Sequence, residues 1–224
     1  MNGNYTVSRC FGDPSVQTGG FPQIGNGYTD PAHPEFDRGY CDQDRRHLGI
    51  FVAGVQAPQL AGPLANAVLS DWRVAGILTA RSGRPVNVIA GQDRSLSGIQ
   101  NQRVNQVLDN PYGDRKTPEH WLNPAAFAQP ALGTLGNFQR NSLRGPGYWS
   151  IDMALSRLIA MGAARKLELR VETFNLLNTF NWGPPTLAFG ADRTHTNFSS
   201  GAFGRITSME GTPRIMQFGV KYGF

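Results

Sequence analysis

The chain has 224 residues, which is enough for one large domain or two small ones with a buried core. It contains 27 Gly and 15 Pro, and only 17% of its residues are charged, so a bundle of solvent-facing helices is disfavoured. The net charge of +5 comes almost wholly from scattered arginines, which argues against a nucleic-acid-binding face, and no stretch approaches the roughly 18 apolar residues of a membrane-spanning helix.

The first half of the chain predicts two strands joined by a short connection. Residues 1–47 are interrupted by Gly, Asn and Pro and are expected to form a loop region. An uncharged run rich in β-formers predicts a strand at about 48–58, and alternation predicts another at about 70–90, broken near Pro85. The segment 91–147 is polar, and it is longer than an ordinary connection within a compact domain.

Two adjacent strands are predicted next. Residues 148–159 alternate cleanly between apolar and polar side chains, and a strand at about 166–178 follows after a turn. Good helix formers make a helix over 154–177 the alternative. Period two fits the start of the second strand without exception, which favours the strand.

The remaining residues complete a regular pattern of loop lengths. A long irregular segment, 179–212, with a candidate short strand at 203–208, leads to a final strand at about 213–224. Loops therefore alternate strictly between long and short along the chain. Antiparallel strands give this order when one rim of a sheet carries large loops and the other carries tight turns, as in transmembrane β-barrels.

The predicted fold class is therefore all-β, an antiparallel transmembrane β-barrel portion of about five strands with long extracellular loops. Residues 1–47 would be an extracellular loop region, and residues 48–224 would hold the C-terminal barrel strands. A soluble β-sandwich could also alternate, but the asymmetry of the loops favours the barrel.

Barrel topology gives each segment an expected place. Counting back from a periplasmic C-terminus puts residues 160–165 in the periplasm and residues 91–147 outside the cell. On the strand at 148–159, Met153 is expected to contact lipid near the middle of the membrane and Ala154 to face the lumen. Aromatic residues near strand ends suit interfacial girdles, or an ordinary core if the protein is soluble; these are Tyr148, Trp149, Phe174, Phe180, Trp182, Tyr222 and Phe224.

The C-terminus carries a recognisable pattern. Gln217 is followed two residues later by Gly219, then by Tyr222 and by the terminal Phe224. This pattern matches the barrel-assembly signal of bacterial outer-membrane proteins, and ending on Phe is its most specific part.

Six further motifs follow in order along the chain: Asp44 to His47, Leu78 to Pro85, Trp121 to Phe127, Leu143 to Gly147, Glu172 to Asn178 and Phe203 to Thr207. Each is weak alone, but together they closely resemble the C-terminal barrel of TonB-dependent transporters of the Oar-like group. The resemblance extends from about residue 40 to the end. It implies a bacterial outer-membrane barrel of about 22 strands whose lumen holds an N-terminal plug.

The chain departs from that family in having about five predicted strands and no recognisable plug, TonB-contacting segment or signal sequence. We therefore expect a C-terminal fragment of a receptor for active uptake of a large or scarce solute. Its implied partners are outer-membrane lipid, the barrel-assembly machinery through the last strand, and TonB only through the missing plug. The alternative is a secreted or surface-exposed β-rich binding module, which would need no detergent.

No enzymatic constellation, metal site or cofactor site is recognised. The spacing of Asp42, Asp44 and His47 could hold a metal, but a charge cluster at a strand entry is favoured. The glycines near Gly145 precede a strand and not a helix, so they do not form a phosphate loop. The remaining candidates are histidines that stand alone in predicted loops and serines without a nucleophile-elbow motif or a neighbouring base. These residues are His33, His120, His195, Ser82 and Ser150.

Cys10 and Cys41 are the two cysteines of the chain, and both lie in sequence rich in Gly, Pro and Asn. Two readings stay open. A loop disulfide formed in an oxidising compartment is slightly favoured over two idle thiols.

Overall fold

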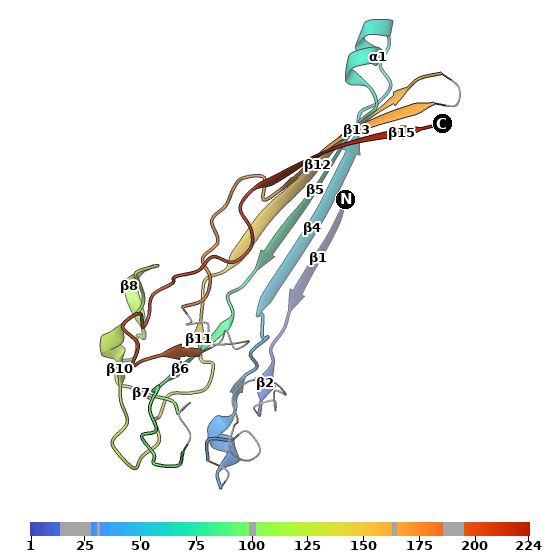
Figure 1. Cartoon of the computed structure of the whole chain (residues 1–224). Coiled ribbons are helices and arrows are strands. Elements are labelled where there is room, and N and C mark those ends of the chain that lie inside the picture. Colours follow the sequence, from blue (N-terminus) through green and yellow to red (C-terminus); the bar gives the residue numbers. More distant parts are fainter. Residues whose placement is uncertain (14–27, 31, 99–101, 163–164, 186–194) are drawn as a thin grey trace.

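The computed structural model describes residues 1–13, 28–30, 32–98, 102–162, 165–185 and 195–224. Within these ranges the chain is mostly β-strand, with one short α-helix, and no helix there is long and apolar enough to cross a membrane. Figure 1 shows an elongated molecule, with long strands toward one end and a cluster of loops at the other.

The main sheet contains six strands in the order β1-β4-β5-β12-β13-β15, and every neighbouring pair is antiparallel. The pairings have no register shift, so side chains on one face form continuous rows across the strands. The antiparallel all-β prediction is confirmed. The strand bounds are β1 Asn2–Val7, β4 His47–Gln56, β5 Trp72–Arg81, β12 Tyr148–Ala160, β13 Lys166–Phe174 and β15 Ile215–Gly223.

The first strand corrects the sequence-based prediction, because β1 lies where only loop was expected. Its sequence contains two Asn and a Gly, which are depleted in strands, so no run of β-formers marks it. Pairing with β4, from Asn2 opposite Val52 to Val7 opposite His47, stabilises it as a strand. The sheet therefore has six strands where about five were predicted.

Short connections join the strands at one end of the sheet. The connection from β4 to β5 contains α1, Pro63–Leu69, where the sequence predicted only a short link. Pro63 begins the helix, where its missing N–H costs no hydrogen bond, and helix-forming Leu and Ala follow it. Figure 1 places α1 and the C-terminus at this end.

The long connections gather at the opposite end of the sheet, and we call their described residues the loop module: 8–13, 28–30, 32–46, 82–98, 102–147, 175–185 and 195–214 (Figure 1). They contain short elements: β2 Phe11–Gly12, η1 Pro34–Asp37, β3 Gly39–Tyr40, β6 Pro85–Ile89, β7 Asn105–Gln106, β8 Tyr112–Thr117, β9 His120–Leu122, η2 Pro124–Ala126, β10 Phe127–Ala128, β11 Leu143–Arg144 and β14 His195–Asn197. β6 pairs with β11 and, in parallel, with β14.

The structure refines one prediction at the loop module and overturns another. The strand expected at about 70–90, broken near Pro85, is interrupted there and forms two strands, β5 and β6, which pair with different partners. The candidate strand at 203–208 does not form, because residues 203–204 are in a turn and residues 205–208 are irregular. Gly204 has φ +74°, and its carbonyl accepts bonds from the N–H groups of Trp121 and Leu122. That conformation suits glycine and interrupts an extended strand.

The hydrophobic core lies in the loop module and not in the sheet. Phe127 packs edge-to-face against Phe138 and Phe203, with ring centroids 5.8 and 5.5 Å apart. The other members of this buried cluster are Val86, Val88, Ala90, Val104, Leu122, Ala126 and Leu143. Burial of these side chains stabilises the long connections as a folded unit.

Candidate functional site

One face of the main sheet is apolar on all six strands. The pairing register aligns this apolar face, which consists of Tyr5, Val7, Phe51, Ala53, Val55, Trp72, Val74, Leu78, Ala80, Trp149, Ile151, Met153, Leu155, Ile159, Leu167, Leu169, Val171, Met216, Phe218, Val220 and Tyr222. Phe218 and Val220 are 76% and 74% exposed. A contiguous exposed apolar surface of this size marks contact with a membrane or a partner.

Aromatic side chains lie near both ends of the apolar face. Trp149 and Tyr5 share a row near the loop module, and Tyr222 shares a row with Ile159 near the short connections. These rows are ten residues apart on β12, or about 33 Å along the strand. A strand tilt of about 40° reduces this to a height of about 25 Å, which is the apolar band of an outer-membrane barrel.

Arg157 is the charged exception on the apolar face. Its guanidinium lies 5.3 Å from the Trp72 ring and donates to the Ala67 carbonyl of α1. A long side chain at the end of the band can thus keep its charge near the interface.

The opposite, polar face carries most of the strand charges. Glu172 and Arg170 form an ion pair of 2.5 Å on neighbouring positions of this face. Ala154 lies on the same face, between Ala75 of β5 and Glu172 of β13. The other polar residues of this face are Asn2, Asn4, Thr6, Gln56, Arg73, Thr79, Arg81, Ser150, Asp152, Ser156, Lys166, Glu168, Gln217 and Lys221, and they are interspersed with apolar Leu48, Ile50, Val52, Ile77, Leu158, Phe174 and Ile215.

A disulfide joins Cys10 and Cys41 where the chain leaves β1 and approaches β4. Their Cα atoms are 5.4 Å apart, and the bridge closes a segment with a sequence separation of 31. The short strands β2 and β3 pair beside it. The bridge therefore fixes the first long connection at the base of the loop module.

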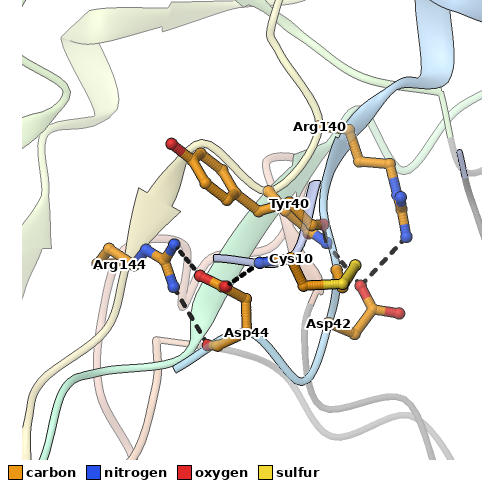
Figure 2. The surroundings of a disulfide bond; sticks show 8 residues. Cys10, Tyr40, Asp42, Asp44, Arg140 and Arg144 are labelled. Carbon is orange, nitrogen blue, oxygen red and sulfur yellow. Dashed lines mark hydrogen bonds and ion pairs between the residues drawn. A yellow bond between two sulfur atoms is a disulfide. The ribbon is translucent and has the colours of Figure 1, made fainter. Parts of the chain in front are cut away.

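Two carboxylates flank the disulfide, as Figure 2 shows. Asp42 accepts hydrogen bonds from Asn141 Nδ2 at 2.6 Å and from Arg140 at 3.4 Å. Asp44 accepts a bond from the Cys10 N–H at 2.7 Å and forms an ion pair with Arg144. These bonds tie the first long connection, between β1 and β4, to the end of the second, between β5 and β12.

The environment of Asp44 favours its charged form. Burial alone would raise its pKa, but the Cys10 N–H and the Arg144 guanidinium outweigh burial, so the pKa of Asp44 lies below its ordinary value of 3.8. The carboxylate is thus a permanent structural anion at neutral pH.

A second, deeper ion pair links the same two connections. Asp37 ends η1 and pairs with Arg103, and both side chains are at most 4% exposed. Arg103 also donates to the Phe138 carbonyl at 2.8 Å and to the Phe36 carbonyl at 2.6 Å. Burial lowers the pKa of Arg103, and its pairing with Asp37 opposes that effect.

An open pocket of about 340 Å³ lies on the loop module between β9 and the segment after β14. Phe203 and Leu122 contribute apolar walls, and Glu119, His120 and Arg205 contribute polar groups. The lining is mixed, which suits a small amphipathic solute but does not select one.

The residues singled out in the sequence take separate positions. Asp42, Asp44 and His47 have different partners, since His47 Nδ1 bonds the Tyr5 hydroxyl at 2.7 Å. The described residues contain no group of three or more His, Cys, Asp or Glu side chains that could hold a metal. The side chain of His195 lies outside the described residues, although its backbone begins β14.

The C-terminal pattern lies on β15, which pairs with β13. Tyr222 is on the apolar face opposite Leu167, Gln217 and Gly219 are on the polar face, and Phe224 follows the strand at 98% exposure. Sequence reasoning did not identify Asp37, Arg103 or Glu210, whose partners are distant in the chain. The sequence did indicate that the long connections are folded, because they contain large hydrophobic residues such as Val86 and Phe138.

A family profile described as outer membrane beta barrel domain matches residues 1–217. No curated protein and no solved structure matches the chain.

Proposed function

The chain belongs to the family of outer membrane β-barrel domains, and from that premise we propose that it forms part of the barrel of a TonB-dependent receptor of the Oar-like group. The chain lies in the bacterial outer membrane, and its transmembrane β-barrel class is the one predicted from the sequence. The proposed activity is active uptake of a large or scarce solute, without a covalent step.

The observation that carries the proposal is the loop module. The long connections are not separate loops, because they share a hydrophobic core and a buried ion pair. A surface held in one conformation at the mouth of a barrel lowers the entropy cost of capturing a solute. The proposal that uptake is driven through TonB rests on the six ordered motifs, which resemble those of TonB-dependent transporters.

The proposal gives each region a role. The apolar face meets lipid, the polar face lines the lumen, and the loop module meets the solute outside the cell. β15 engages the barrel-assembly machinery, and TonB acts through a plug domain of the same receptor.

Crosslinking in living cells tests the energy coupling. An epitope tag inserted after Gly133, which is exposed and has open space around it, would be placed in the chromosomal gene of the natural protein. After formaldehyde treatment, a tagged adduct containing TonB is expected, and it should disappear when TonB is deleted. Absence of the adduct in cells where another TonB-dependent receptor does crosslink would refute the proposal.

A further inference from the structure

Three arginines converge on one carboxylate at the junction of the sheet and the loop module. Oε1 of Glu210 lies 2.7 Å from Arg81, 3.4 Å from Arg45 and 3.8 Å from Arg84. Arg81 ends β5, Arg45 precedes β4 and Arg84 precedes β6. We call these four residues the arginine cluster.

The arginine cluster carries an uncompensated positive charge. Three guanidiniums face one carboxylate, which leaves a formal charge of +2. The nearby Asp44 does not compensate, since it is paired with Arg144. Burial lowers the pKa of Arg45 to about 10, and repulsion from the other arginines adds to that effect against the opposing pull of Glu210.

Two of the three arginine side chains in the cluster are partly exposed. The side chains of Arg84 and Arg81 are 39% and 31% exposed, while that of Glu210 is 14% exposed. Nε of Arg81 is buried and has no hydrogen-bond partner among the described residues. The Tyr148 ring lies 4.3 Å from the Arg81 guanidinium and covers it. The Arg84 guanidinium, whose side chain is the most exposed of the three, is thus the group best placed to meet a further acceptor.

We propose that the arginine cluster binds an oxyanion, a phosphate or carboxylate group, in competition with Glu210. Arginine forks match such groups geometrically, and an added anion would offset the excess charge. Arg81 shares a row of the polar face with Thr6, which puts the site at the lumenal mouth beside the loop module. The group therefore belongs to a solute and not to a lipid headgroup. Binding stands on these contacts, whereas identifying the group with the transported solute rests on the proposed function.

Calorimetric titration of the detergent-purified protein with inorganic pyrophosphate tests the site. Arg84→Gln removes the most exposed guanidinium and should weaken binding by about tenfold or more. Glu210→Gln removes the competing carboxylate and should tighten binding. Arg115→Gln, an exposed arginine of β8 in the loop module, makes the same charge change and should leave binding unchanged.

Two results would contradict the proposed oxyanion site. Equal weakening by Arg84→Gln and Arg115→Gln would mean a diffuse charge effect, and weaker binding by a folded Glu210→Gln protein would contradict the competition. Circular dichroism establishes folding of each variant.

A second experiment, with phosphatidylcholine vesicles that contain lipid A, distinguishes a solute from a lipid headgroup. If Arg84→Gln weakens vesicle binding but not pyrophosphate binding, the assignment to a solute is wrong. Because binding needs no TonB, loss of the TonB adduct alone would refute the proposed function and leave this site standing.

Discussion

Replacing Met153 with arginine should destabilise the protein far more than the same replacement of its neighbour Ala154. Met153 lies on the apolar face in the row of Gly76 and Thr173, four residues from the row of Trp149. That position is about 10 Å inside a band of about 25 Å, so it lies close to the membrane midplane. An arginine there costs roughly 2 to 4 kcal/mol.

The Ala154 position lies on the polar face beside Glu172, where an arginine can stay hydrated and close to a carboxylate. The expected loss there is below about 1 kcal/mol. Guanidinium titration of both variants, refolded in lipid vesicles, measures the difference, with Met153→Leu as a volume-matched control. Equal losses would contradict a lipid-facing surface, and the reverse order would mean that the two faces are exchanged.

Three further outcomes are expected. An epitope after Gly133 should be labelled on intact cells and one after Gly162 only after the outer membrane is permeabilised; the reverse would invert the predicted topology. Cys10→Ser should lower the stability of the oxidised protein by about 3 to 4 kcal/mol, and dithiothreitol should then have no further effect in denaturant titrations. Asp37→Asn should cost about 3 to 5 kcal/mol because it leaves a buried guanidinium unpaired, whereas Asp13→Asn, in an exposed pair, should cost below about 1 kcal/mol; similar losses would refute this difference in burial.

The strands that the sequence predicted best are those whose two sides meet different surroundings. β12 and β13 alternate because one side carries apolar residues and the other carries charges such as Glu172. That requirement is local, so period two is visible without a structure. β1 was missed because its sequence contains two Asn and a Gly, and its conformation depends on a partner strand 40 to 50 positions away.

The loop module was predicted only as long loops, because its contacts are distant in sequence. Asp37 and Arg103 are separated by 66 residues, and Arg45 and Glu210 by 165. No local pattern pairs one arginine among many with one carboxylate. Composition did contain a hint, since buried residues such as Val86 and Phe138 are unusual in solvated loops.

The sheet and the loop module are stabilised by different surroundings, and the arginine cluster lies where they meet. None of the buried hydrophobic residues in the described chain lies on the six main strands, so we expect the stability of the sheet to depend on lipid against its apolar face. The loop module instead folds around its own hydrophobic core, which is shielded from water. It also joins the strand ends, through the disulfide between β1 and β4 and through Glu210 on Arg81 of β5. A folded module at the mouth thus fixes the spacing of the guanidiniums before any solute arrives, which is the condition for selective anion binding.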